Sequence, residues 1–186
     1  MKLFLLISFL FLSATTLAQK KPIPSSYKQF EEEQTRAMAK YIGTPYRAIK
    51  VFIDSIEYSN ATMKGKIVFM NFWFEACPPC IAEFEGLNAM YKKLKGDTNI
   101  VFIGISFETP ETIKKIKNKY HIQYGIASVP EAECYKLNFN NGFPTSVILD
   151  SAGIIRYIHT GGTTNVGEAK KFILKDIYPV LSAMLQ

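Results

Sequence analysis

An almost uninterrupted apolar run, residues 67–74 (IVFMNFWF), leads into the tetrapeptide Cys77-Pro78-Pro79-Cys80. The run is rich in β-branched and aromatic residues, which is typical of a strand buried on both faces. Pro79 stands where a helix can begin, because the first helical residues do not need their N–H groups. The sequence therefore predicts a buried strand, a short loop that holds two cysteines, and a helix that runs to about Lys95.

The two cysteines are three residues apart and can form a small, reducible disulfide. A helix N-terminus favours the thiolate of a nearby cysteine, and the thiolate is the form that attacks another disulfide. A disulfide across so short a loop constrains little of the unfolded chain, so its value is chemical. A zinc site would need two more ligands at short spacing, whereas Cys134, His121 and His159 are single and scattered. We expect no metal, and a structural role for both histidines.

The chain of 186 residues suits one domain with additional segments. Its first 18 residues have the order of a secretory signal peptide: Lys2, an apolar run over 3–12, and small residues up to Ala18. The apolar run is shorter than the roughly 20 residues that a bilayer span requires. We therefore expect a signal peptide at 1–18 with cleavage near Ala18-Gln19, a polar extension at 19–42, a domain at 43–186, and a secreted or periplasmic protein.

Composition is that of an ordinary globular protein, with 48% hydrophobic and 20% charged residues. The formal net charge is +6. The lysines of segments 92–95 and 114–119 are spaced like the solvated faces of two helices, not like a nucleic-acid-binding stripe. No nucleic-acid partner is expected.

The order of elements predicts an α/β fold. A βαβ unit followed by a ββα unit gives a central mixed β-sheet flanked by helices, here with an N-terminal strand or hairpin extension. The expected strands are 48–53, 67–74, 99–106, 146–149 and 154–158. The expected helices are 31–36, 79–95, 110–120, 131–135 and a C-terminal helix from Gly167 that Pro179 kinks or breaks.

Asn71-Phe72-Trp73 running into Cys77-Pro78-Pro79-Cys80, with Gly142-Phe143-Pro144-Thr145 downstream, resembles the thioredoxin superfamily. Within it, residues 43–180 are most similar to the exported TlpA/ResA-type thiol–disulfide oxidoreductases. The resemblance implies a thioredoxin-like fold, no cofactor beyond the redox-active disulfide, protein disulfides as substrates, and a membrane thiol as electron donor. Cys77, at the exposed helix mouth, would attack a substrate disulfide, and Cys80 would resolve the mixed disulfide.

The resemblance also assigns supporting residues. Pro144 matches a cis-proline that lies against the disulfide, so Phe143, Pro144 and Thr145 are expected to bind substrate. Glu83 matches a partly buried glutamate that, with a raised pKa, could relay the proton. Asn71 stands where thioredoxin has a buried acid. Because the Asn71 side chain is a neutral amide, it cannot titrate, and another group is expected to do the acid–base work.

Trp73, Pro78 and Pro79 are expected to support the loop that carries the cysteines. Ala76 replaces a tryptophan that many relatives carry before the first cysteine, so this flank is expected to be open. Cys134 is expected to be a buried, inert thiol, with a redox partnership with Cys77 as the alternative.

Three other functions share parts of this pattern. A disulfide oxidase would use the same residues in the opposite direction, and a disulfide isomerase would use them without net oxidation or reduction. A thiol peroxidase would need a Pro-x-x-x-Thr-x-x-Cys pattern, which the sequence lacks. A non-catalytic thioredoxin-fold binding module would not need both cysteines.

Overall fold

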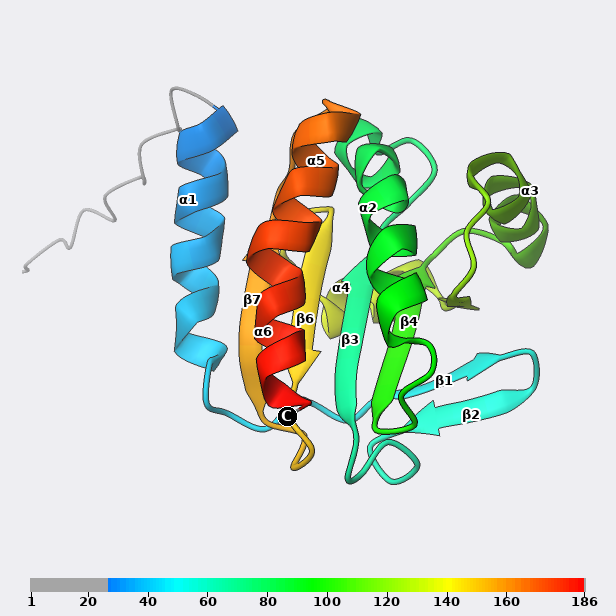
Figure 1. Cartoon of the computed structure of the whole chain (residues 1–186), viewed down its shortest axis with the longest axis vertical. Helices are drawn as coiled ribbons and strands as arrows, with labels where there is room; N and C mark the ends of the chain where they lie inside the picture. Colours follow the sequence, from blue (N-terminus) through cyan, green and yellow to red (C-terminus); the bar gives the residue numbers. More distant parts are fainter. Residues whose placement is uncertain (1–26, 186) are drawn as a thin grey trace, which may run out of the picture.

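A five-stranded mixed sheet, with the strand order β5-β4-β3-β6-β7, forms the centre of the structure, a computed structural model that describes residues 27–185 (Figure 1). Its strands are β3 (Ile67–Phe72), β4 (Ile100–Ser106), β5 (Gly125–Ser128), β6 (Thr145–Leu149) and β7 (Ile155–Thr160). Strands β3, β4 and β5 are parallel to one another, and β6 and β7 are antiparallel to their neighbours. The predicted mixed sheet is confirmed.

Helices cover the sheet. They are α1 (Tyr27–Met38), the short η1 (Ala39–Tyr41), α2 (Pro78–Leu94), α3 (Pro110–Tyr120), α4 (Glu131–Leu137), α5 (Val166–Phe172), the π-helical η2 (Ile173–Ile177) and α6 (Tyr178–Met184). Helix α2 and the C-terminal helices lie side by side over β3 and β6 (Figure 1). Within residues 27–185, no helix combines the length and the apolar character needed to cross a membrane.

Strand β3 has a buried residue at every position, as a strand covered on both faces requires. Its side chains alternate between two apolar clusters. Met70 and Phe72 belong to one cluster, together with Cys134 of α4. Phe69 belongs to the other, together with Cys77 and Cys80 at the start of α2. Asn71, which follows Met70, therefore faces the same side of the sheet as the cysteines.

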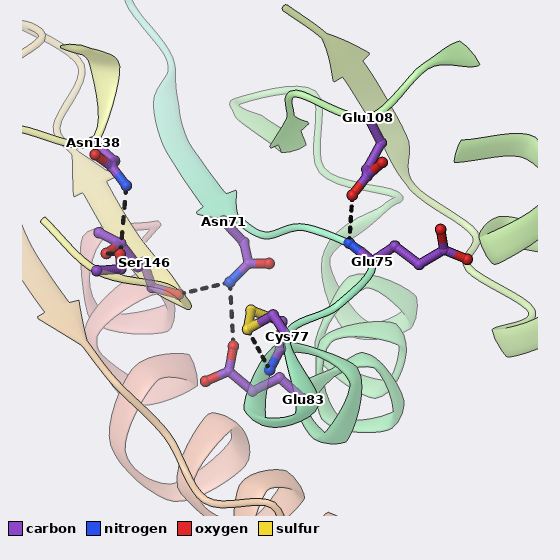
Figure 2. Close-up of a disulfide and its surroundings, with 10 residues drawn as sticks. Asn71, Glu75, Cys77, Glu83, Glu108, Asn138 and Ser146 are labelled. Carbon is purple, nitrogen blue, oxygen red and sulfur yellow. Dashed lines mark hydrogen bonds between the residues drawn. A yellow bond between two sulfur atoms is a disulfide. The ribbon is translucent and has the colours of Figure 1, made fainter. Parts of the chain in front are cut away.

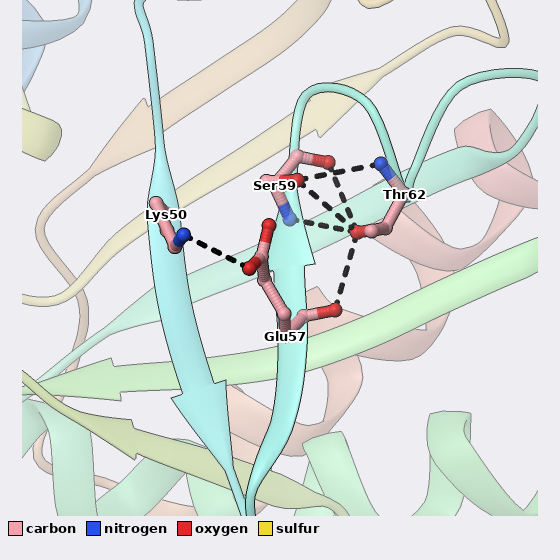
Figure 3. Close-up of polar contacts among 4 residues, drawn as sticks. All are labelled: Lys50, Glu57, Ser59 and Thr62. Carbon is pink, nitrogen blue, oxygen red and sulfur yellow. Dashed lines mark hydrogen bonds and ion pairs between the residues drawn. The ribbon is translucent and has the colours of Figure 1, made fainter.

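The N-terminal hairpin is confirmed as a separate two-stranded sheet, β1 (Lys50–Ile53) and β2 (Ile56–Ser59), which lies against β5. Asp54 and Ser55 both have positive φ angles, 49° and 67°, as a two-residue type I′ turn requires. Lys50 forms an ion pair of 3.0 Å with Glu57, and the backbone N–H of Ser59 donates to Thr62 Oγ1 over 2.8 Å (Figure 3).

One expected strand needs correction, and one strand was missed. Strand 67–74 ends at Phe72, because the next residues form the loop that carries the cysteines. Strand β5 was not predicted, because Gly125-Ile126-Ala127-Ser128 is short and contains one β-branched residue.

The C-terminal helix is irregular at the expected place: five π-helical residues run directly into α6, whose second residue is Pro179. The predicted helix 31–36 lies within α1, which packs against β7. The expected signal peptide lies outside the described residues. The proposed boundary near residue 43 stays a prediction.

Candidate active site

Cys77 and Cys80 form a disulfide at the N-terminus of α2, with their Cα atoms 5.3 Å apart. Cys77 is the N-cap residue, and its Sγ accepts a hydrogen bond of 3.3 Å from the backbone N–H of Cys80 (Figure 2). Pro78 and Pro79 occupy the first two helical positions and have no N–H. The first turn of α2 therefore offers the Cys77 sulfur one amide donor.

The expectation that Cys77 lies at an exposed helix mouth is wrong for the disulfide form. Cys77 is 4% exposed and Cys80 is 1% exposed. Both lie in the apolar cluster that contains Trp73 and Phe84, whose rings meet edge to face at 5.2 Å. Cys77 is still the more accessible of the two, and both of its chain neighbours are exposed. The open flank expected at Ala76 is therefore present.

The Phe143–Pro144 peptide bond is cis, as predicted. Strand register brings this bond to the disulfide, because Thr145 of β6 is the partner of Phe72 at the end of β3. The carbonyl of Pro144 accepts a hydrogen bond of 2.9 Å from the N–H of Gly161. Within residues 27–185, no hydrogen bond engages the backbone N–H or C=O of Phe143.

Buried polar side chains hold the segment before Pro144 in place. Asn138 Nδ2 donates to the carbonyl of Asn141 over 3.1 Å, and the Asn141 side chain in turn donates to Thr160 Oγ1. Thr145 Oγ1 donates to the carbonyl of Gly142 over 2.6 Å. Thr145 is fully buried, so its side chain positions the loop and does not face the surface. Sequence reasoning missed Asn138, Asn141 and Thr160, whose roles depend on pairing between distant segments.

Glu83 is 2% exposed, which is deeper than the partial burial expected of it. Asn71 Nδ2 donates to Glu83 Oε2 over 3.3 Å and to Ser146 Oγ over 3.2 Å (Figure 2). Asn71 and Ser146 are cross-strand partners in β3 and β6, so their side chains share one face of the sheet. In contrast, Glu85 is exposed and pairs with Lys170 at 2.6 Å.

A cavity of about 500 Å³ opens beside the first turn of α2, and Pro79, Glu83 and His159 contribute to its wall. Burial lowers the pKa of His159, although the nearby Gly161 backbone and Asp176 oppose this effect. Gly162 also lines the cavity, and a Cβ atom there would lie 3.3 Å from Glu83 Oε1. The glycine therefore permits this close approach, which sequence reasoning did not identify.

Cys134 is fully buried and free. Burial, and to a smaller extent the charge of Glu131, raises its pKa to about 12. It belongs to the apolar cluster on the opposite side of the sheet from Cys77 and Cys80. The arrangement favours the inert thiol over the redox partner.

His121 ends α3 in a left-handed conformation with φ of 52°, which agrees with a structural role. No group of three or more histidine, cysteine or acidic side chains within residues 27–185 is arranged to hold a metal ion.

Known proteins with similar sequences are named for thiol–disulfide exchange. The chain is 25% identical over 122 residues to the thiol-disulfide oxidoreductase ResA of Halalkalibacterium halodurans, a match covering 63% of this chain and 69% of that protein. It is 27% identical over 184 residues to the thiol:disulfide interchange protein DsbE of Haemophilus influenzae, covering 95% and 94% of the two chains.

Among solved structures, a thiol:disulfide interchange protein from a Bacteroides species superposes with a TM-score of 0.56 at 23% identity, covering 73% of this chain and 91% of that chain. This likeness confirms the thioredoxin-like fold, and the named relatives confirm the resemblance found in the sequence. The family model of AhpC/TSA matches residues 42–158, which include the disulfide, Glu83 and the cis-proline. The chain therefore belongs to the AhpC/TSA family of thioredoxin-like proteins.

Proposed function

We propose that this protein is an exported thiol–disulfide oxidoreductase that reduces disulfides in other proteins. The observation that carries the proposal is the Cys77–Cys80 disulfide at a helix N-terminus, next to the cis-proline Pro144. Relatives named ResA and DsbE support this activity, and the leader-like residues 1–18 support export.

In the reduced protein, the thiolate of Cys77 attacks one sulfur of a substrate disulfide. A mixed disulfide forms, and the other substrate sulfur leaves as a thiolate that takes up a proton. Cys80 then loses its proton and attacks the Cys77 sulfur, which forms the Cys77–Cys80 disulfide and releases the second substrate thiol. Two electrons pass to the substrate, and a thiol donor at the membrane returns them to the protein.

The reducing direction is supported by the first turn of α2. A disulfide couple becomes more oxidising when its thiolate form is stabilised. Because Pro78 and Pro79 carry no N–H, one amide hydrogen bond reaches Cys77 Sγ. This limited stabilisation of the Cys77 thiolate favours a more reducing Cys77–Cys80 couple.

Glu83 is assigned the role of accepting the proton that Cys80 loses. Both residues lie on α2, and their spacing of three positions places them on one face of the helix. The cavity beside Glu83 provides a route by which the proton reaches solvent. Asn71 is the positioning residue, because it ties the Glu83 carboxylate to β3 and to Ser146 of β6.

The backbone of Phe143 is assigned the role of binding the main chain of the substrate. Its N–H and C=O groups are open within the described part of the chain and lie just before Pro144 and the start of β6. An extended segment can add to such groups as an additional strand, which gives affinity through main-chain hydrogen bonds.

The reduction of insulin disulfides by dithiothreitol tests the proposal. The protein should accelerate the reaction, Cys77→Ser should abolish the acceleration, and Cys80→Ser should accumulate a mixed disulfide. Cys134→Ser is the matched control and should retain full activity, because Cys134 lies on the other side of the sheet. If the unmodified protein leaves the insulin reaction unaccelerated, the proposal is wrong.

A further inference from the structure

Four aromatic rings from distant segments meet next to the loop that carries the cysteines. The aromatic cluster consists of Phe74, Phe107, Tyr135 and Phe143. Phe74 meets Phe107 at 5.5 Å and Phe143 at 5.3 Å between ring centroids. Phe143 also meets Phe107 at 5.9 Å and Tyr135 at 5.3 Å. These distances are those of interacting aromatic pairs, so the four rings form one unit.

The aromatic cluster is not part of the buried core. Tyr135 is 36% exposed, and its three partners are half-buried. The rings of Phe69 and Phe72 in β3, and of Trp73 directly after it, are, in contrast, completely buried. Adjacent aromatic rings that remain open to water on a folded protein are typical of a binding surface.

The position of the cluster links it to the reacting sulfur. Phe143 contributes both a ring to the cluster and the open backbone groups beside Pro144. Phe74 precedes Cys77 by three residues on the loop from β3. An extended segment rises about 3.3 Å per residue, so side chains one or two positions from a substrate cysteine can reach the rings.

Charged groups around the cluster already have partners within the described residues. Glu75 pairs with Lys115 at 3.1 Å, and Glu133 pairs with Lys136 at 3.0 Å. Glu108 accepts the backbone N–H of Glu75 over 2.8 Å (Figure 2). The rings are therefore the apolar part of a surface on which several charged neighbours engage groups of the chain itself.

We propose that the aromatic cluster selects protein substrates that carry an aromatic or long aliphatic side chain within two residues of the reacting cysteine. The occupant is an extended segment of the substrate, seated on the rings while its backbone pairs with Phe143. This inference rests on the proposed disulfide exchange and adds the substrate class that the site prefers.

Two disulfide-linked peptides test the preference. They differ at one position, with leucine or serine next to the cysteine, and hydroxyethyl disulfide serves as a substrate that cannot reach the cluster. We expect kcat/KM to be roughly fivefold to tenfold higher for the leucine peptide, as burial against aromatic rings provides. Tyr135→Ala and, separately, Phe107→Leu should reduce that ratio, while reaction with hydroxyethyl disulfide stays unchanged.

Phe52→Ala is the matched control, because Phe52 is a 53% exposed ring on the distant hairpin. It should leave the peptide ratio unchanged. Equal kcat/KM values for the two peptides, or a ratio that survives in both Tyr135→Ala and Phe107→Leu, would overturn the inference. A dimer that Tyr135→Ala dissociates would also overturn it, by assigning the rings to a second copy of the chain. Failure to reduce either peptide or hydroxyethyl disulfide would instead overturn the proposed function.

Discussion

The side-chain amide of Asn71 in β3 donates a hydrogen bond of 3.3 Å to the carboxylate of Glu83 in α2. The same nitrogen donates to Ser146 Oγ, so both of its N–H groups are used. Glu83 is the buried carboxylate in the wall of the cavity beside the disulfide. Asn71, a neutral residue of the central strand, thus orients this carboxylate. In the proposed division of roles, Glu83 carries the proton of Cys80 and Asn71 holds the Glu83 carboxylate in place.

Replacing Asn71 by alanine should destabilise the oxidised protein by about 1–3 kcal/mol, because buried acceptors on Glu83 and Ser146 lose their donor. Denaturant unfolding of the disulfide form measures the change. Ser146→Ala is the matched control and should cost less, since Asn71 keeps its bond to Glu83. Equal stability of Asn71→Ala and the unmodified protein would show that this contact contributes nothing.

Replacing Glu83 by glutamine should slow the resolution of the mixed disulfide by about 10²-fold and flatten its dependence on pH, as the loss of a general base does. Stopped-flow measurement of substrate thiol release at several pH values provides the test. Glu85→Gln, two residues further along α2 and exposed, should behave like the unmodified protein. A pH profile unchanged by Glu83→Gln would remove Glu83 from the mechanism.

Replacing Pro79 by alanine should make the Cys77–Cys80 couple more oxidising by about 20 mV, because a new N–H at the second helical position can donate to Cys77 Sγ. Equilibration with glutathione buffers measures the shift. Pro78→Ala supplies the control, because an N–H at the first helical position does not reach the N-cap side chain. Equal shifts in the two variants would contradict the role given to the helix cap.

Cys134 should resist alkylation in the folded protein and react only after unfolding. Its folded pKa of about 12 lies above its ordinary value of 9.0, so the unfolded state loses this proton first as the pH rises. The stability that Cys134 contributes is therefore complete below pH 9.0 and is lost between pH 9.0 and 12. Cys134→Ala should show a weaker decline of unfolding free energy over that range; an identical decline would refute the assignment.

The site could be predicted from the sequence wherever its residues are neighbours in the chain. Cys77, Cys80 and the two prolines are contiguous, and the apolar composition of the preceding segment predicts the buried strand. Pro144 was found through the resemblance of its surrounding tetrapeptide. In contrast, the depth of Glu83 depends on how α2 packs against β3, which no local pattern specifies.

The parts that sequence reasoning missed depend on contacts between distant segments. Asn138 and Thr160 are 22 positions apart in the chain and meet through Asn141. The aromatic cluster joins four segments whose rings are unremarkable one by one. The burial of Cys77 was missed for the same reason, because Trp73 and Phe84 enclose the disulfide only after α2 has packed on the sheet.

The reduction potential of the Cys77–Cys80 couple, measured in dithiothreitol or glutathione buffers with Cys134 replaced by serine, tests the central claim most directly. A reductant of protein disulfides should show a reversible two-electron couple near the thioredoxin value, about −270 mV. A potential near that of DsbA, about −120 mV, would make the protein a disulfide donor and contradict the account.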